Sequence, residues 1–282
     1  MLTGSLPAEH RTQFNADGFV VVDDILGLAR IDHAVIGELH DSFDRLFRGE
    51  FETGVAPDEV NWQEGESDPT LTRQICNGWR ADRTVAAIVL HERLAAAIGQ
   101  LMGWSSVRLI QDNMLWKPAG AKTLGFHRDN AYLDWYRPAQ MATCWIALDQ
   151  TTTAGGTLEF ARGSHRWPAT GGVEVGFHAP LDHEASVRSA AAAAHADLDA
   201  VAVEVPPGGG SFHHGDTWHG SGPNTTGDHR RALVIHCAPG WVRFHRPGFG
   251  SGTGPIYSRY AHPDHDLMDE SHFPVVMCEG GG

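Results

Sequence analysis

The chain has 282 residues, and its 21 Lys and Arg residues against 35 Asp and Glu residues give a formal net charge of −14 with histidine neutral. Apolar residues make up 41% and charged residues 20%, which is typical of globular proteins and excludes disordered, collagen-like and coiled-coil chains. The acidic balance argues against nucleic acid and anionic membrane surfaces as partners, because both need a basic face.

The first third of the chain is predicted to be mainly helical. A short helix is expected over residues 7–16, and Gly18 separates it from a strand over residues 19–22. Apolar residues at helical spacing predict longer helices over residues 31–48 and 84–102.

After residue 105 the pattern changes to short strands separated by Gly and Pro turns. The expected strands cover residues 107–116, 142–148, 157–160, 201–205, 210–213 and 231–237, with an Ala-rich helix over 185–198 inserted between them. Such a series is typical of a β-sandwich or barrel. We therefore expect one mainly β domain over residues 1–282, with a helical N-terminal part (about 1–104), a β-core (about 105–240) and a C-terminal tail.

A His-x-Asp motif and a distant histidine form the strongest candidate metal site. His127 and Asp129 are two residues apart, so in a strand both side chains project to the same side and can bind one ion. A third ligand must come from another strand, and His219 precedes the strand expected at 231–237. Two imidazoles and one carboxylate leave adjacent metal positions open, which suits Fe(II). The alternative is three ordinary polar residues at strand ends.

Two arginines stand at the start of the strand that follows His219. A guanidinium at Arg230 or Arg231 can reach back toward the metal and hold a dicarboxylate through two hydrogen bonds. The alternative for Arg230 is a surface ion pair, with Arg231 as the fallback for the binding role.

These segments together resemble the phytanoyl-CoA dioxygenase family of Fe(II)/2-oxoglutarate-dependent oxygenases. The resemblance extends over roughly residues 10–275 and is carried by Gln111–Pro118, Gly125–Asp129, Gly155–Phe160, Gly163–His165, His219–Asn224 and Arg230–Ala232. It implies a double-stranded β-helix (jelly roll) that binds Fe(II) through His127, Asp129 and His219 and uses 2-oxoglutarate and O₂. The cosubstrate contacts that it implies are Arg230, Ser221, Trp145 and Asn113, with Gln111 as a neighbour on the same strand face.

Three further positions qualify the resemblance. Arg128 stands where the family often has Gln, so a contact of that Gln with the cosubstrate or substrate is in doubt here. An upstream cationic contact falls on Arg73. Asp129 is retained, whereas relatives that halogenate lack this carboxylate, so the resemblance argues against halogenation.

Several of these residues also have structural interpretations. Ser221 between two glycines suits a plain turn, and Trp145, Gln111 and Asn113 suit core packing or strand pairing. His165, the His213–His214 pair and the tail group with His262 and His265 are interpreted as structural residues in turn-rich stretches. The aromatic residues that flank the site are expected in part to line a substrate pocket: Phe126, Tyr132, Trp135, Trp218 and Trp241.

The predicted function is oxidation of an unactivated C–H of a small metabolite or natural product, most simply hydroxylation, with succinate and CO₂ as coproducts. The same cofactor chemistry used for epimerisation, desaturation or cyclisation is the first alternative. A zinc hydrolase or a jelly-roll binding module is the second, because two histidines, an aspartate and water also suit zinc. With only two lysines, Lys117 and Lys122, a CoA thioester is disfavoured as substrate. Specificity is expected in the N-terminal helices and the 163–210 insertion.

The chain ends and cysteines indicate the compartment. Residues 1–10 contain no basic segment followed by an apolar core, and no apolar run is expected to span a membrane. The four cysteines show no CxxC spacing, so free thiols are expected: Cys76, Cys144, Cys237 and Cys278. We therefore expect a cytoplasmic enzyme with no membrane or nucleic-acid partner, and no oligomeric state is predicted.

Overall fold

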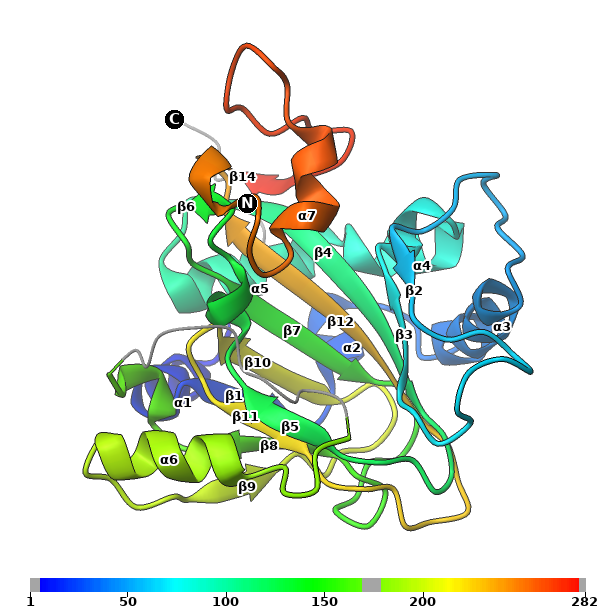
Figure 1. Cartoon of the computed structure of the whole chain (residues 1–282), viewed down its shortest axis with the longest axis vertical. Coiled ribbons are helices and arrows are strands. Elements are labelled where there is room, and N and C mark those ends of the chain that lie inside the picture. The colour runs from blue at the N-terminus through cyan, green and yellow to red at the C-terminus, as the bar shows by residue number, and fades with distance from the viewer. Residues whose placement is uncertain (1–5, 169–178, 279–282) are drawn as a thin grey trace.

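The structure is a computed structural model that describes residues 6–168 and 179–278. Two antiparallel sheets face each other and helices cover the outside of the larger one (Figure 1). The larger sheet contains, in spatial order, β1 (Phe19–Val22), β10 (Gly210–His214), β7 (Ala142–Ala147), β12 (Arg230–Pro239), β4 (Ser106–Lys117), β3 (Arg73–Cys76) and β2 (Glu59–Val60), and β14 (Val275–Cys278) also pairs with β4. The smaller sheet contains β5 (Leu124–His127), β11 (His219–Ser221), β8 (Leu158–Ala161) and β9 (Ala200–Ala202). This arrangement confirms the predicted jelly roll.

The remaining elements are one small sheet and several helices. The small sheet pairs β6 (Tyr136–Arg137) with β13 (Arg243–Phe244). The α-helices are α1 (Ala8–Asp17), α2 (Ile25–Ala29), α3 (Val35–Phe47), α4 (Arg83–Val89), α5 (Glu92–Met102), α6 (Ala185–Ala193) and α7 (Gly254–Tyr257). Short 3-10 helices are η1 (Gly78–Arg80), η2 (Asp129–Tyr132), η3 (Ser164–Arg166), η4 (Arg246–Gly248) and η5 (Ser258–Tyr260).

The larger sheet is buried on both faces, and residues along its strands point alternately to one face and the other. On the outer face, Leu233 and Ile235 belong to one core cluster with side chains of α3, α4 and α5. On the inner face, Trp145 and Val234 pack with Phe160 of the smaller sheet. The inner face also carries polar residues, and these form the candidate site described below.

The N-terminal helices differ from the predicted ones at their ends. The helix expected over 31–48 begins at Val35, since the Asp32 carboxylate accepts a hydrogen bond from the Ala34 N–H in the preceding turn, at 2.9 Å. The short helix α2 was not predicted, and neither were the short strands β2 and β3 within the predicted helical part. The helix expected over 84–102 is two helices, because His91 adopts an extended conformation (φ −75°, ψ 117°) between them.

The segment Arg83–Met102 is as long and apolar as a membrane span. An 18-residue window within these 20 residues has a mean hydropathy of 1.4, so by length and composition the segment could cross a membrane, contrary to the expectation from sequence. However, 56% of that window is buried inside the protein, and α5 packs on β4, β7 and β14. These contacts are those of a core helix pair.

Candidate metal and cosubstrate site

The three predicted metal ligands lie together between the two sheets. His127 ends β5 and His219 begins β11, and the two residues are direct cross-strand partners with ring centroids 4.1 Å apart. Asp129 is the first residue of η2, so the His-x-Asp motif spans the end of a strand and not its interior. Arg128 between them is still extended (φ −122°, ψ 133°), which keeps both side chains on one side. The ligand atoms of His127, Asp129 and His219 all lie within 4.8 Å of one another.

Backbone carbonyls orient both imidazole rings. His127 Nδ1 lies 3.0 Å from the Gly125 carbonyl oxygen, and His219 Nδ1 lies 2.9 Å from that of Thr217. Donation from Nδ1 leaves the Nε2 lone pairs free, and these atoms lie 3.8 Å and 3.5 Å from Asp129 Oδ1. Burial, with His219 next in importance, lowers the pKa of His127 to about 3, so this imidazole is neutral as metal binding requires. The donor set therefore fits a divalent transition metal such as Fe(II).

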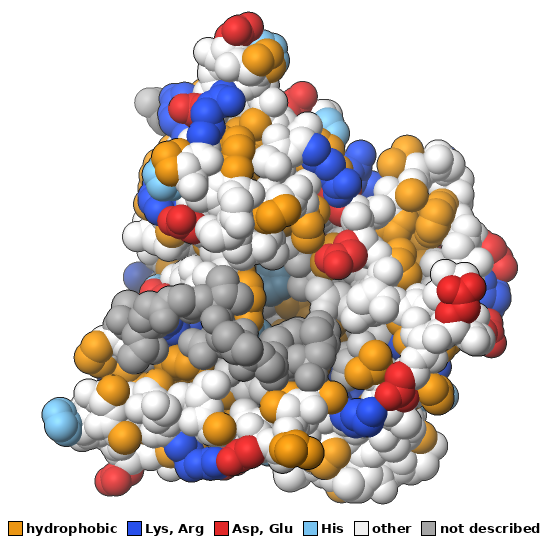
Figure 2. Space-filling model, in the orientation of Figure 1, with side chains coloured by type: hydrophobic (Ala, Val, Ile, Leu, Met, Phe, Trp, Pro, Cys, Tyr) orange, Lys and Arg blue, Asp and Glu red, His pale blue; other side chains and the backbone are white. Residues whose placement is uncertain are grey.

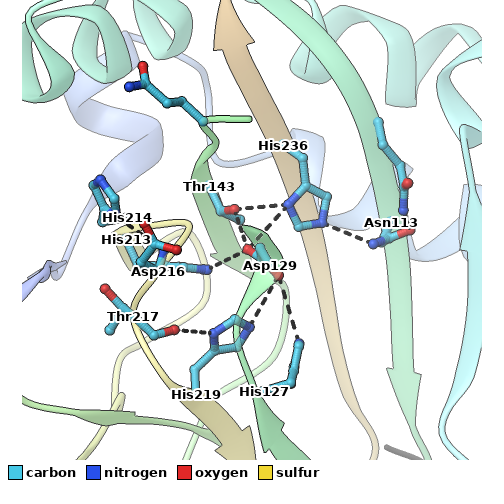
Figure 3. Close-up of polar contacts among 12 residues, drawn as sticks. Asn113, His127, Asp129, Thr143, His213, His214, Asp216, Thr217, His219 and His236 are labelled. Carbon is cyan, nitrogen blue, oxygen red and sulfur yellow. Dashed lines mark hydrogen bonds and ion pairs between the residues drawn. The ribbon is translucent and has the colours of Figure 1, made fainter. Parts of the chain in front are cut away.

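The second oxygen of Asp129 is fixed by other polar side chains (Figure 3). Thr143 Oγ1 donates to Asp129 Oδ2 at 2.8 Å, and His213 Nε2 lies 3.2 Å from the same atom. His236 Nδ1 lies 2.9 Å from Thr143 Oγ1, and its Nε2 lies 3.0 Å from Asn113 Nδ2. Because the Asn113 amide donates to Nε2, His236 must carry its proton on Nδ1. The hydrogen bonds therefore run in one direction, from Asn113 through His236 and Thr143 to the Asp129 carboxylate. The pKa of His236 is lowered by burial, consistent with a neutral ring.

Cross-strand register explains how these residues meet. Thr143 of β7 lies opposite His236 of β12 on one side and opposite His213 of β10 on the other. His236 in turn lies opposite Gln111 of β4. Opposite residues point to the same face of a sheet, so this row of polar side chains faces the metal ligands. His213 was interpreted as a structural turn residue and His236 was not singled out. The sequence signal for His236 was its place as a histidine among the apolar residues of the strand expected over 231–237.

A cavity of about 570 Å³ connects the metal ligands with Arg230. Every predicted site residue lines it: His127, Asp129, His219, Arg230, Ser221, Trp145, Asn113 and Gln111. Figure 2 shows the hollow near the centre of one face, with histidine visible inside it.

Arg230 is a buried cation with few protein partners. Its Nη2 donates to the Gly156 carbonyl oxygen at 2.9 Å, and its guanidinium lies 5.7 Å from the Trp145 ring centroid. No carboxylate in the described part of the chain forms an ion pair with it, and its Nε has no hydrogen-bond partner there. Burial lowers the pKa of Arg230 to about 10. A buried guanidinium without a carboxylate partner favours binding of an anion.

Lys117 is a second buried basic residue at this end of the site, and the sequence analysis did not assign it a role. It lies opposite Arg230 in register, and its Nζ donates to Ser221 Oγ at 2.6 Å and also to the Gly222 carbonyl oxygen. Burial, followed by the charge of Arg230, lowers the pKa of Lys117 to about 6. The Lys-Pro pair at the end of the 107–116 strand was the available signal, because a lysine in a buried strand needs a specific partner.

The amides of Asn113 and Gln111 form a network on the inner face of β4. Gln111 Nε2 donates to Asn113 Oδ1 at 2.7 Å, and Tyr257 of α7 donates its hydroxyl hydrogen to Gln111 Oε1. Asn113 therefore joins His236 to the cavity wall. The predicted common face of Gln111 and Asn113 is confirmed.

The chain is similar to known proteins in both sequence and fold. The family described as phytanoyl-CoA dioxygenase (PhyH) matches residues 14–232 of the chain. The chain belongs to this family. A PhyH-type relative, a probable phytanoyl-CoA dioxygenase of Caenorhabditis elegans, is 31% identical over 121 residues, which are 40% of this chain and 35% of that protein.

Two further proteins are similar over longer stretches. A probable alpha-ketoglutarate-dependent hypophosphite dioxygenase of Stutzerimonas stutzeri is 27% identical over 188 residues, 64% of this chain and 63% of that protein. The chain thus spans less than two thirds of either curated relative. The solved structure of SnoK, a non-haem alpha-ketoglutarate-dependent carbocyclase from nogalamycin biosynthesis, has a TM-score of 0.73 at 20% identity and covers 96% of this chain and 97% of its own. These matches confirm the predicted family and jelly-roll fold, and they agree with the predicted enzyme class.

Two arginines that the PhyH resemblance singled out lie outside the cavity lining. Arg73 lies between the rings of Trp62 and Trp116, with its Cζ 3.7 Å and 4.5 Å from their centroids, and it does not line the cavity. It points outward because it lies opposite Trp116 in register, and Trp116 is on the outer face of β4. Arg128 packs 5.3 Å from the Trp218 ring centroid and also does not line the cavity. The cosubstrate role considered for Arg73 is therefore not supported by its position.

The fallback residue Arg231 is also explained. Its Nε and Nη2 both lie 3.0 Å from oxygens of Asp149, a two-point ion pair on the face opposite the cavity. Adjacent strand residues face opposite sides, so Arg230 alone of the pair reaches the site.

Most of the other singled-out residues have structural positions. Of the five flanking aromatic residues expected near the site, the described cavity lining includes Tyr132. Phe126 and Trp218 pack in a cluster with α6, Trp135 is in the C-terminal core, and Trp241 is 53% exposed. His262 and His265 stack on each other at 4.3 Å, away from the metal ligands.

Proposed function

We propose that this chain is an Fe(II)/2-oxoglutarate-dependent dioxygenase that binds iron through His127, Asp129 and His219. The observation that supports this best is the convergence of two oriented imidazole Nε2 atoms and one carboxylate oxygen at the bottom of a cavity whose other end holds a buried guanidinium. When bound, the iron supplies activation of O₂ coupled to oxidative decarboxylation of 2-oxoglutarate.

Arg230 and Ser221 are proposed to hold the distal carboxylate of 2-oxoglutarate, with Lys117 positioning Ser221. Arg230 offers N–H donors and lacks an ion-pair partner in the described residues, while Lys117 fixes the Ser221 hydroxyl by donating to its oxygen. The Ser221 hydrogen is then free to donate to the ligand. Leu115, Leu124 and Leu158 line this end of the cavity, and apolar walls strengthen the attraction between a guanidinium and a carboxylate.

The remaining residues position the metal ligands and the substrate. Thr143 and His213 hold Asp129 in one orientation, so that Oδ1 faces the two imidazoles. Trp145, Asn113 and Gln111 form the wall along which we place the keto-acid end of the cosubstrate and the substrate. The cavity keeps the reacting C–H close to the metal ligands and excludes bulk water from it.

The proposed reaction is hydroxylation of a C–H of a small metabolite or natural product, with succinate and CO₂ as coproducts. Epimerisation, desaturation and cyclisation use the same site, and product mass distinguishes them. A gain of one oxygen indicates hydroxylation, a loss of two hydrogens indicates cyclisation or desaturation, and an unchanged mass indicates epimerisation. A cytoplasmic location remains part of this proposal.

The test is formation of succinate from 2-oxoglutarate by the purified protein with and without Fe(II). We expect turnover to require Fe(II), and His127→Ala and His219→Ala to abolish it because each removes one of three ligands. Anaerobic addition of Fe(II) and 2-oxoglutarate should also produce a visible charge-transfer band. Full turnover in both variants, or hydrolysis supported by zinc without consumption of 2-oxoglutarate, would contradict the proposal.

A further inference from the structure

We propose that the substrate of this enzyme carries a cationic amine, and that Glu59 binds it at the β2–β3 wall, defined here as Glu59, Asn61 and Gln74. The inference rests on the proposed function, because it concerns the substrate part of the same cavity. All three side chains line the cavity, and they come from the edge of the larger sheet (Figure 1).

Strand register aims Glu59 into the cavity. Glu59 of β2 lies opposite Cys76 of β3, and Cys76 lies opposite Asn113 of β4. Since opposite residues share a face, Glu59 is on the same face as Asn113 and therefore on the side of the metal ligands. The Asn61 side chain fixes β2 at this position, because its Oδ1 accepts from the Gln74 backbone N–H at 2.6 Å.

A neighbouring thiol orients the carboxylate. Cys76 Sγ lies 3.7 Å from Glu59 Oε2, and burial raises the pKa of the Cys76 thiol, so the S–H remains available as a donor. The sulfur accepts hydrogen bonds from the amides of Gln74 at 3.3 Å and Gln111 at 3.7 Å. Glu59 is thus connected to the amide network that leads to His236 and Asp129.

Glu59 has no counter-ion among the described residues, in contrast with the carboxylate next to it. Asp58 forms ion pairs of 2.9 Å with both Arg80 and Arg259 and accepts hydrogen bonds from Asn77 and Tyr260. No ion pair between residues that the structure describes involves Glu59, although its exposed side chain lines the cavity. Within the described cavity lining, the one Lys or Arg is Arg230, which the cosubstrate would occupy. The uncompensated charge available to a substrate is therefore negative.

Hydrogen-bonding capacity near Glu59 also favours a donor as ligand. The Gln74 and Gln111 amide nitrogens both donate to Cys76 Sγ and to Asn113 Oδ1. The Thr253 hydroxyl donates to the Tyr132 carbonyl oxygen at 3.2 Å. These three cavity-lining groups have used their hydrogens within the protein, whereas the Glu59 carboxylate and Gln74 Oε1 remain acceptors. An ammonium group supplies N–H donors and a positive charge together.

The same features disfavour anionic substrates. A CoA thioester or an oxyanion would place negative charge beside Glu59 with no free cation in the described lining to compensate it. This chain is therefore expected to differ in substrate charge from relatives whose names indicate phytanoyl-CoA or hypophosphite as substrate.

The test uses three probes with one carbon skeleton: cyclohexylamine, cyclohexanol and cyclohexanecarboxylate. Binding of each to the full-length protein loaded anaerobically with Fe(II) and 2-oxoglutarate is measured by titration calorimetry. We expect the amine to bind about tenfold more tightly than the carboxylate, since attraction is replaced by repulsion at a partly exposed charge. Glu59→Gln should remove this preference. Glu64→Gln should retain it, because it deletes the same charge from the loop after β2, outside the described cavity lining.

Each outcome decides the inference. Equal affinity for the three probes, tighter binding of the carboxylate, no detectable binding of any probe, or a preference that survives in Glu59→Gln overturns it. Failure of the proposed function is a separate result, because it would appear as absence of Fe(II)-dependent succinate formation by the unmodified protein. A charge preference that depends on Glu59 is measurable whether or not turnover occurs.

Discussion

Lys117 Nζ lies 2.6 Å from Ser221 Oγ, and both side chains are buried. The same amino group is beside Arg230 in cross-strand register, so two basic side chains share this region, and no carboxylate in the described part of the chain forms an ion pair with either. Burial and the charge of Arg230 together lower the pKa of Lys117 to about 6. A dicarboxylate bound at this end of the cavity therefore supplies the counter-charge that Arg230 lacks among the described residues.

This pKa predicts how stability depends on pH. In the unfolded chain the same lysine has its ordinary pKa of 10.5, so between pH 6 and pH 10.5 the unfolded chain binds a proton that the folded chain does not. Stability of the protein without 2-oxoglutarate should then rise with pH through this window, and Lys117→Met should reduce the slope by at most about 1.4 kcal/mol per pH unit. Urea unfolding at several pH values measures this slope. Lys122→Met is the matched control, because Lys122 is a half-exposed lysine paired with Asp68.

A second prediction concerns the hydroxyl group of Thr143. It donates to Asp129 Oδ2 at 2.8 Å and receives the Nδ1 hydrogen of His236 at 2.9 Å. Thr143→Val keeps the volume but removes both hydrogen bonds, so Asp129 should be less well oriented and Fe(II) affinity should fall by about tenfold or more. Anaerobic Fe(II) titration measures the effect.

Thr143→Ser serves as the rescue variant for this prediction. It retains the hydroxyl group, and we expect it to restore most of the Fe(II) affinity. Equal losses in the Val and Ser variants would indicate that packing at Thr143, and not its hydrogen bonds, sets the affinity.

The parts of this site that could be predicted are those set by short-range chain geometry. His127 and Asp129 are joined by the extended residue Arg128, so their common direction follows from a spacing of two residues even though the strand ends between them. The same alternation places Arg230 and Arg231 on opposite faces of β12, because they are adjacent in the strand.

The residues that were missed depend on register between strands far apart in sequence. His213, His236 and Lys117 are each ordinary members of a strand until their cross-strand partners are known. β2 has two residues, too few for any periodic pattern, yet it places Glu59 in the cavity. Arg73 shows the converse, since a cation at a plausible sequence position faces away from the site.

The position of Arg73 gives a third prediction. Arg73→Met should leave the KM for 2-oxoglutarate unchanged, because the guanidinium packs between Trp62 and Trp116 on the outer side of the sheet. Loss of these cation–π contacts should instead lower the free energy of unfolding by about 1 kcal/mol. Steady-state kinetics and urea unfolding separate the two effects. A large rise in KM with unchanged stability would show that Arg73 reaches the cosubstrate after all.

The last prediction compares the two arginines at the start of β12. Arg230→Met removes the cation that lines the cavity, so affinity for 2-oxoglutarate should fall by about 30-fold or more, the range found when one partner of a buried charged pair is deleted. Arg231→Met removes a cation paired with Asp149 on the opposite face, so the affinity should be unchanged while stability falls by about 1 kcal/mol. Because a ligand that binds the folded state raises its stability, the rise in Tm on adding 2-oxoglutarate with Fe(II) measures affinity without relying on turnover. That rise should be lost in Arg230→Met and kept in Arg231→Met, and the reverse pattern would assign the anchor to Arg231.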